Sequence, residues 1–276
     1  MIVLDPASGY AALTQGVGAT SQTCDLVRAE GPDTVKFLQS QLSQDVEKLE
    51  LGVPRLSFLL QPQGRIIALL QVERTDDATV DMVTDPGFGE PIRLALERFK
   101  IRTKCTLHLE SVTRFAVRGP MAATEGVWPG WRGPDVEVLP DGVALVDPLV
   151  FEAVRIERGV ARNGAEIEEK TLPGETGLVA LAVSFSKGCY VGQELVERID
   201  SRGHVNRRLV GLDISGHAPI EAHEPITLGD KTVGTITSVA IHPLRDTTIA
   251  LAYLRREVEA GTSVRVGSVD AMVRSL

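Results

Sequence analysis

The sequence predicts an α+β fold that ends in a small β-barrel. Up to about residue 205, segments with the three-and-four spacing of apolar residues typical of helices alternate with apolar runs typical of strands. From Arg207 onward only short apolar runs remain, and glycine, proline and aspartate separate them. A series of short strands with turn residues between them indicates a barrel or sandwich. We therefore expect two regions, 1–205 and 206–276.

The first helix of the N-terminal region is expected to open at Gly31-Pro32-Asp33. A proline suits the first helical turn, and an acid is favourable at the amino end of a helix. Val35, Leu38 and Leu42 then lie on one face, which indicates an amphipathic helix that ends before Gly52.

A hairpin is expected next, because apolar runs at 56–60 and 65–72 flank the turn sequence Gln61-Pro62-Gln63-Gly64. The same reasoning predicts strands at 79–83, 106–109 and 114–117 and a second helix at 92–99. In the C-terminal region the expected strands are 209–214, 232–239, 247–254, 263–266 and 269–273.

A loop is expected at 126–134, where proline and glycine leave no room for a regular element. Trp128 and Trp131 within it have two interpretations. They could wall a pocket for a flat ligand, or they are packing anchors, which is the commoner role of two such side chains in a loop.

Composition excludes several classes of protein. The chain has 276 residues, of which 43% are hydrophobic and 24% charged, as in globular proteins rather than disordered or collagen-like ones. A net charge of -8 argues against direct binding to nucleic acid or to an anionic membrane surface, so an anionic ligand needs a local basic site. The longest clean apolar run, 178–183, is far shorter than a membrane span.

The cysteines and the N-terminus predict a cytoplasmic location. Cys24, Cys105 and Cys189 are an odd and widely spaced set, which does not build a disulfide framework. The segment Met1 to Pro6 carries an acid and a proline where a signal peptide needs a basic end and an apolar core. No two histidines have metal-ligand spacing and no Cys-x-x-Cys occurs, so no metal site is expected.

The segment KGCYVGQE, residues 187–194, carries the most unusual chemistry. Val191, Leu195 and Ile199 have helical spacing, so Cys189 is expected just ahead of a helix. The unpaired amides of a helix amino end and a nearby Lys187 both favour a thiolate. The alternative is a buried cysteine at a loop–helix junction, since cysteine is among the most buried residue types.

Basic residues gather around this segment against the trend of the chain. Residues 187 to 208 include five basic and three acidic residues. Such a patch could receive a carboxylate or a phosphate, because arginine offers a planar fork of donors. The alternative is a solvated helix face whose charges pair with one another.

KGCYVGQE resembles the signature of the YgfZ family. These are folate-binding proteins related in fold to the glycine-cleavage aminomethyltransferases, and they include mitochondrial iron-sulfur assembly factors. Eight residues in this order are a specific signal. The likeness spans most of the chain apart from the Trp-rich loop, and it extends to 37–46, 60–66, 155–159, 173–178 and 203–209.

The resemblance implies mixed α/β modules around a folate-binding cleft, with two intertwined modules in 1–205 and a C-terminal β-barrel in 206–276. It places Glu175 where the transferases direct a carboxylate toward the pterin, whose adjacent nitrogens are donors. Arg198, Arg207 or Arg208 would meet the glutamate tail of tetrahydrofolate or another folate derivative. The motif is implied to supply Cys189 and Lys187 to the chemistry and Tyr190, Gly192, Gln193 and Glu194 to cofactor binding.

One stretch departs from the aminomethyltransferase pattern. Those enzymes have a sequence resembling Gly-Gly-Ile-x-Asp-Asp, and one of its aspartates serves the chemistry on the folate nitrogen. Here Ala68 and Leu69 stand in place of the two aspartates, and neither can carry a proton or a charge. Loss of a general base costs on the order of a hundredfold to ten-thousandfold in rate.

The leading hypothesis is a folate-binding protein that supports assembly or repair of iron-sulfur clusters and thereby influences tRNA modification indirectly. One cysteine cannot hold a cluster, which usually takes four thiolates, so the expected partners are iron-sulfur carrier or client proteins. Two alternatives stay open: a tetrahydrofolate-dependent aminomethyltransferase in which another acid replaces the missing aspartates, and a non-enzymatic scaffold for an iron-sulfur carrier. The residues leave open whether any reaction is catalysed.

Overall fold

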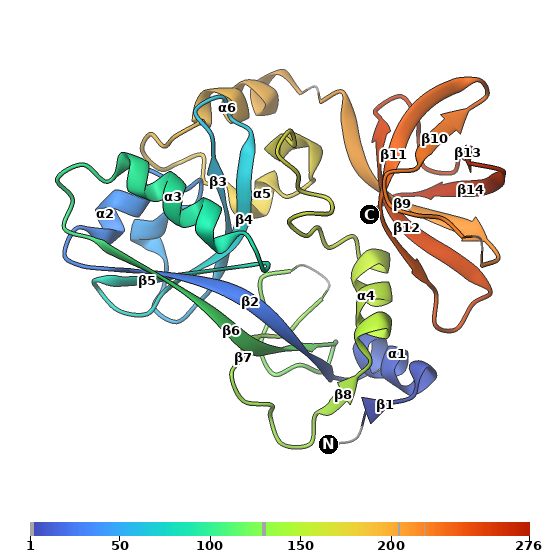
Figure 1. Cartoon of the computed structure of the whole chain (residues 1–276), viewed down its shortest axis with the longest axis horizontal. Helices are drawn as coiled ribbons and strands as arrows, with labels where there is room; N and C mark the ends of the chain where they lie inside the picture. Colours follow the sequence, from blue (N-terminus) through green and yellow to red (C-terminus); the bar gives the residue numbers. More distant parts are fainter. Residues whose placement is uncertain (1–2, 129–130, 204, 218) are drawn as a thin grey trace. The chain divides into compact units, whose positions relative to one another are not determined.

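A computed structural model of the chain describes residues 3–128, 131–203, 205–217 and 219–276 (Figure 1). The chain forms two compact units, and each unit is assembled from separated segments. The first comprises residues 1–22, 114–161 and 205–276, and the second comprises residues 23–113 and 162–204. The expected mixture of helices and strands followed by a C-terminal barrel is confirmed.

The second unit is built on an antiparallel sheet. Its neighbouring strands are, in order, β2 (Gly18–Glu30, which begins in the first unit), β5 (Thr79–Thr84), β4 (Ile66–Arg74) and β3 (Arg55–Leu60). Strand β6 (Thr106–Arg118) begins in this unit and ends in the first.

Two helices supply apolar side chains to the core of this sheet. Helix α2 (Thr34–Gln39) contributes Phe37 and Leu38, and helix α3 (Gly89–Phe99) contributes Ile92 and Leu96. Ile92 and Leu96 are four residues apart, and Phe37 and Leu38 lie three and four residues after the buried Thr34, so each helix buries one face. The remaining helical segments of the unit are 3-10 helices at Val46–Lys48 and Pro173–Glu175, α5 (Val179–Ala182) and α6 (Gln193–Arg202).

The sequence predicted the hairpin, the strand at 79–83 and the second helix correctly, but α2 is shorter than expected. After Gln39 the chain leaves the helix, because Ser43 exchanges bonds with β3: its amide donates to Phe58 O (3.0 Å) and its Oγ accepts from Phe58 N (2.8 Å). The strands expected at 106–109 and 114–117 form one continuous strand, β6.

Among the described residues, no helix has the length and apolar character needed to cross a membrane.

The turn of the β3–β4 hairpin packs against the start of α6. Gly64 and Gly192 both have positive φ angles, of 78° and 83°. A Cβ atom on Gly192 would lie 2.6 Å from Gln61 O, and one on Gly64 would lie 2.6 Å from Leu195 Cβ. Both positions therefore need glycine, for backbone conformation and for close approach.

The first unit contains two helices that begin at an Asp-Pro pair. Asp5 Oδ1 accepts hydrogen bonds from Ala7 N (3.0 Å) and Ser8 N (3.1 Å) at the start of α1 (Pro6–Gln15). Asp147 Oδ1 accepts from Leu149 N (2.8 Å) at the start of α4 (Pro148–Glu157). An acidic cap followed by proline is a strong helix start. The short strands of this unit are β1 (Val3–Leu4), β7 (Asp135–Val136) and β8 (Ala144–Val146).

The Trp-rich loop anchors the core of these helices. Trp131 is buried, and its ring lies 4.7 Å from that of Phe151 on α4. The Arg118 guanidinium lies 5.6 Å from the Trp131 ring and pairs with Asp135 at 2.7 Å. Trp131 is therefore a packing anchor, which was one of its two interpretations. Pro129 and Gly130 of the same loop lie outside the described residues.

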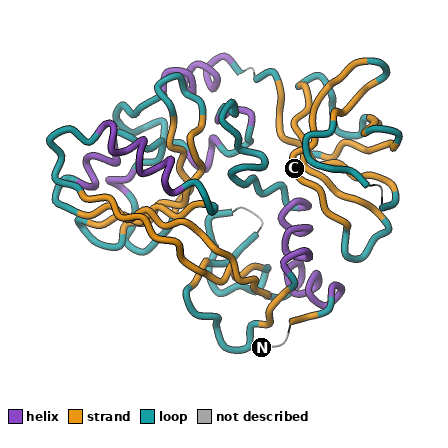
Figure 2. The backbone as a smooth tube through the Cα atoms, viewed as in Figure 1, coloured by secondary structure: helices purple, strands orange, loops and turns teal. Residues whose placement is uncertain are grey.

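The C-terminal segment closes into a six-stranded antiparallel barrel, which Figure 2 shows as almost entirely strand and turn. Inward-facing Leu212, Ile236 and Leu254 are fully buried in its core. The sequence missed β10, a four-residue strand in which only Ile226 is buried. The strands are β9 (Arg207–Ser215), β10 (Pro225–Leu228), β11 (Lys231–Ile241), β12 (Thr247–Arg255), β13 (Ser263–Val266) and β14 (Val269–Arg274).

A polar cluster ties α1 and α4 to the barrel within the first unit. Glu157 accepts a hydrogen bond from the Tyr10 hydroxyl (2.8 Å) and one from Arg245 (3.1 Å). His242 Nε2 lies 3.4 Å from Glu157, and His242 Nδ1 accepts from the amides of Leu244 and Arg245. Burial, and secondarily Arg245, lower the pKa of His242 below its ordinary value of 6.5.

The glycine contact predicts that Gly192→Ala destabilises the protein by about 2–4 kcal/mol, because the added methyl group meets Gln61 O and the residue keeps a positive φ. Gly188 is the matched control in the same motif, since a Cβ there meets nothing within 4 Å. Gly188→Ala should range from neutral to about 1 kcal/mol more stable. Urea unfolding monitored by circular dichroism measures both, and equal effects of the two substitutions would contradict the steric requirement at Gly192.

The His242 cluster predicts acid sensitivity with a defined sign. Because the folded state holds the pKa of His242 below 6.5, the unfolded state binds the proton more tightly, so stability is full above about pH 6.5 and falls as the pH decreases. His242→Asn keeps an acceptor near the position of Nδ1 and does not titrate. The variant should lose less unfolding free energy than the parent between about pH 7.5 and pH 5.5, and an identical loss in both proteins would refute this role.

Candidate functional site

Residues 187–192 of the KGCYVGQE segment lie in the loop between α5 and α6, and Gln193 and Glu194 begin α6. The segment Ser40–Gln44 holds this loop in place. Lys187 Nζ donates hydrogen bonds to Leu42 O (2.6 Å) and Gln44 O (2.7 Å). Val191 N donates to Ser40 O (3.2 Å). The loop is therefore fixed on both sides of Cys189.

Cys189 is exposed at the middle of this loop. The interpretation of Cys189 as a buried cysteine is therefore wrong, because the bonds of Lys187 and Val191 to the Ser40–Gln44 segment leave Gly188 and Cys189 between them on the surface. The expected position ahead of a helix is confirmed, since α6 begins at Gln193. Cys24 and Cys105, by contrast, are buried.

The side chain of Lys187 bonds to the protein backbone rather than extending into solvent. Its side chain is half-buried, and burial lowers the pKa of its amine to about 8. The two carbonyl oxygens of Leu42 and Gln44 accept its hydrogens, and the ring of Tyr190 lies 5.2 Å from Nζ. A lysine with this pKa is partly neutral near physiological pH, so it can also exchange a proton.

Tyr190 provides a buried hydroxyl beside this lysine. The residue is 7% exposed, and its Oη has no hydrogen-bond partner among the described residues. Its amide donates to Gln193 Oε1 (2.8 Å), and burial raises the pKa of the phenol to about 12. A buried hydroxyl without a partner costs free energy unless a ligand or water pairs with it.

Glu175 is a second buried polar group in the same unit. It is 7% exposed at the end of the 3-10 helix Pro173–Glu175, and one carboxylate oxygen accepts from Leu172 N (3.1 Å). That 3-10 helix packs against α6, which starts within the motif. A carboxylate accepts hydrogen bonds, so this position is compatible with a ligand that offers N–H groups.

The positions expected to replace the transferase aspartates, Ala68 and Leu69, are closed. Ala68 and Leu69 are buried in β4, and Asn163 seals the backbone there: its Oδ1 accepts from Leu69 N and its Nδ2 donates to Leu69 O, both at 2.8 Å. Asn163 also donates to Asp85 Oδ2 from its amide (2.9 Å) and its side chain (2.8 Å). The sequence reasoning missed Asn163 and Asp85, because no spacing rule relates residues so far apart.

The expected site residues divide between the two units. Glu194 and Arg198 are exposed on α6, in the same unit as Glu175 and the motif loop. Arg207 and Arg208 lie on β9 in the other unit, where Arg207 stacks 4.5 Å from the Tyr253 ring and Arg208 donates to Val258 O (3.0 Å). The side chains of Arg202 and His204, which belong to the same basic stretch, lie outside the described part of the chain.

The described residues show no group of three histidine, cysteine, aspartate or glutamate side chains that could hold a metal ion. What the second unit does offer is an exposed thiol on a fixed loop, a lysine of lowered pKa and two buried polar groups, Tyr190 Oη and Glu175, near one helix.

Comparison with known proteins identifies the barrel and the fold. Residues 207–274 match the model of the glycine cleavage T-protein C-terminal barrel domain. The crystal structure of the glycine cleavage system aminomethyltransferase T of Bartonella henselae superposes with a TM-score of 0.82 at 21% sequence identity, covering 98% of this chain and 88% of that one. This likeness establishes the fold of the whole chain.

Relatives with three different names are similar to this chain in sequence. The chain is 27% identical over 290 residues to the aminomethyltransferase of Rippkaea orientalis, covering 86% of this chain and 78% of the relative. It is 27% identical to the tRNA-modifying protein YgfZ of Serratia proteamaculans, with 87% and 85% covered. The mitochondrial iron-sulfur cluster assembly factor IBA57 homolog of Mycosarcoma maydis is 30% identical over 223 residues, with 68% and 54% covered, so the chain spans about half of that relative.

These relatives have similar identities, so none of their names transfers to this chain on identity alone. The barrel match, the fold of the whole chain and the relatives agree at a broader level. The chain has the fold of a glycine-cleavage aminomethyltransferase, and its residues 207–274 match the C-terminal barrel domain of that family.

Proposed function

We propose that the chain binds tetrahydrofolate or a related folate and supports assembly or repair of iron-sulfur clusters, with an indirect effect on tRNA modification. The observation that carries the proposal is the exposed Cys189 on a loop fixed by Lys187, next to a helix flanked by buried polar groups. Relatives named as iron-sulfur assembly factors and as a tRNA-modifying protein support it.

The residues present fit a pterin. Glu175 is a buried carboxylate that can accept from adjacent N–H groups, as a pterin ring offers. The Tyr190 hydroxyl, buried without a partner among the described residues, can pair with a polar atom of the same ligand. A bound reduced folate would supply one-carbon carrier chemistry, while these side chains bind and orient it.

The glutamate tail of a folate carries negative carboxylates, which cationic side chains would bind. Arg198 is exposed on α6, and Arg207 and Arg208 begin the barrel. Arginine binds carboxylates through two parallel hydrogen bonds, so Arg198, which is in the same unit as Glu175, is the candidate for the tail. Gly192, Gln193 and Glu194 complete the proposed cofactor-binding set, with Gly192 permitting the close packing of the loop.

Aminomethyl transfer is the second candidate function, and Asp85 is the acid that could stand in for the missing aspartates. Asn163 links its carboxylate to the backbone of Leu69, which occupies one of the replaced positions. However, Asp85 Oδ2 already accepts two hydrogen bonds from Asn163. This arrangement holds the carboxylate in a structural role and weighs against a free general base.

The exposed thiol of Cys189 favours a function in iron-sulfur cluster assembly or repair. Clusters usually take four thiolates, and Cys24 and Cys105 are buried, so Cys189 would contribute one ligand or one exchanging thiol to a complex with a carrier or client protein. The dispersed cysteines point to a reducing compartment, and we place the protein in the cytoplasm on that ground. A scaffold that only docks such a carrier, with folate as a stabiliser, is the non-enzymatic form of this proposal.

Calorimetric titration with tetrahydrofolate tests the cofactor. Glu175→Gln keeps an acceptor for Leu172 N but removes the charge, so affinity should fall about tenfold to a hundredfold. Glu169→Gln removes an exposed carboxylate from the same region and should leave affinity unchanged. Undiminished binding by Glu175→Gln would remove this residue from the site, and absence of binding by the parent would end the folate proposal.

Complementation tests the thiol. In a host strain lacking its own protein of this kind, Cys189→Ser should fail to restore iron-sulfur enzyme activity while its melting temperature and tetrahydrofolate affinity stay at parental values. Ser186→Ala changes an exposed neighbour in the same loop and should restore activity. Full restoration by Cys189→Ser, or a large fall in its melting temperature, would show that the thiol has no such role.

A further inference from the structure

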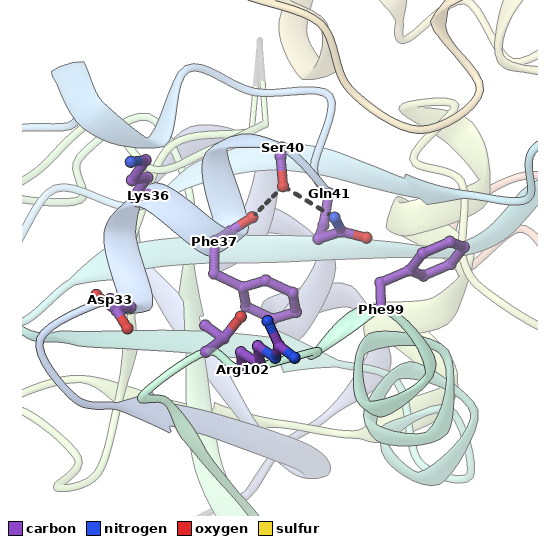
Figure 3. Close-up of a pocket in the computed structure, with 8 residues that line it drawn as sticks. Asp33, Lys36, Phe37, Ser40, Gln41, Phe99 and Arg102 are labelled. Carbon is purple, nitrogen blue, oxygen red and sulfur yellow. Dashed lines mark hydrogen bonds between the residues drawn. The ribbon is translucent and has the colours of Figure 1, made fainter.

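A hollow of about 410 Å³ lies between α2 and the segment that follows α3 (Figure 3). Lys36, Phe37 and Gln41 line it from one side, and Phe99 and Arg102 line it from the other. Its volume is within the range of small-molecule sites, which runs from about 300 to 1,000 Å³. None of these residues belongs to the cofactor site proposed above.

The charge of the hollow is positive in a chain of net charge -8. Lys36 and Arg102 are exposed, and neither forms an ion pair or side-chain hydrogen bond with another described residue. The one acid of the lining, Asp33, accepts a hydrogen bond from Lys104 N (2.8 Å) through Oδ2. Two cations that line one hollow and have no partner among the described residues favour an anionic ligand, and the guanidinium suits a carboxylate or a phosphate in particular.

The apolar part of the hollow is aromatic. Phe37 is buried beneath it, and Phe99 is 38% exposed at its edge. In Figure 3 the Phe37 ring lies beside Arg102, and Phe99 extends from the opposite side. Aromatic side chains pack well against flat rings, so the lining suits a ligand with a planar apolar group.

Gln41 adds a directed acceptor. The residue is 6% exposed, and its Nε2 donates to Ser40 Oγ (2.9 Å), which in turn donates to Phe37 O (2.7 Å). These bonds orient the amide, so that its nitrogen faces Ser40 and its oxygen points away (Figure 3). No described residue donates to Gln41 Oε1, which leaves this oxygen for an N–H or O–H group of a ligand.

The backbone of Arg102 is held in an unusual conformation. Its φ angle is 57°, in the left-handed region that residues other than glycine rarely adopt. Such residues concentrate at ligand sites, where the surrounding structure holds them. Here the conformation places an unpaired guanidinium at the hollow.

We propose that this hollow binds a small planar aromatic or heteroaromatic molecule that carries a phosphate or a carboxylate and a hydrogen-bond donor on its ring. Lys36 and Arg102 hold the anion, Phe37 and Phe99 contact the ring, and Gln41 Oε1 accepts from the donor. The site is separate from the cofactor site, although Val191 of the motif loop donates to the backbone of Ser40 beside it (3.2 Å).

Titration of the whole chain with 4-hydroxyphenyl phosphate and 4-hydroxybenzoate tests the proposal, with inorganic phosphate and phenol as partial probes. The two aromatic anions should saturate below about 10 mM and shift the side-chain amide signals of Gln41 in NMR spectra, and each partial probe should bind at least about tenfold more weakly. The preferred aromatic anion then tells whether the natural group is a phosphate or a carboxylate. Absence of saturation, or an unmoved Gln41 signal, would overturn the site.

Variants check the roles of the cations. Arg102→Gly removes the guanidinium and accepts the positive φ, so the fold should be kept, and both it and Lys36→Gln should weaken binding at least about fivefold. Lys231→Gln removes an exposed charge from the barrel and should change nothing; an equal loss in this control would show non-specific attraction. Tetrahydrofolate should not compete, and competition would show that the hollow belongs to the folate site.

Discussion

The contact between the motif loop and the Ser40–Gln44 segment is the constraint on which the second unit depends. Lys187 donates to two carbonyls of that segment, and Val191 donates to a third. Ser43 Oγ donates to Ala182 O (2.6 Å), and Gln44 Nε2 donates to Leu181 O (3.0 Å), so α5 is attached to the same segment. Residues about 145 positions apart thus satisfy each other's backbone groups, and Cys189 is presented by a braced loop rather than a free one.

The same bracing explains how a superfamily fold can hold different chemistry. Ala68 and Leu69, which the resemblance places at the two transferase aspartates, are apolar and buried, and Asn163 bonds to the backbone of Leu69. Across the unit, Glu175 and Tyr190 remain polar and buried. A ligand that needs recognition but no general base is compatible with this distribution of polar groups, and under the proposed function the exposed thiol of Cys189 would be the reactive group.

Local patterns predicted what local forces determine. The β3–β4 hairpin, α3 and five barrel strands follow from apolar spacing and turn residues, and the helix after Cys189 follows from Val191, Leu195 and Ile199. The end of α2 was misplaced because Ser43 bonds to Phe58, a tertiary contact that overrides helix propensity. For the site, the sequence identified the motif but not the exposure of Cys189, the orphan Tyr190 hydroxyl or Asn163, since each depends on partners distant in the chain.

The interleaving of the two units has a consequence for how the chain is made. The second unit has all its residues once position 204 has left the ribosome, whereas the first also needs the barrel strands that follow. Within the first unit, α1 has no α4 to cover Leu13 until residues 148–157 have been made, and Tyr10 waits for Glu157, its partner 147 residues later. The nascent chain therefore carries its opening helix as exposed apolar surface through much of synthesis, a period in which a chaperone has a defined segment to protect.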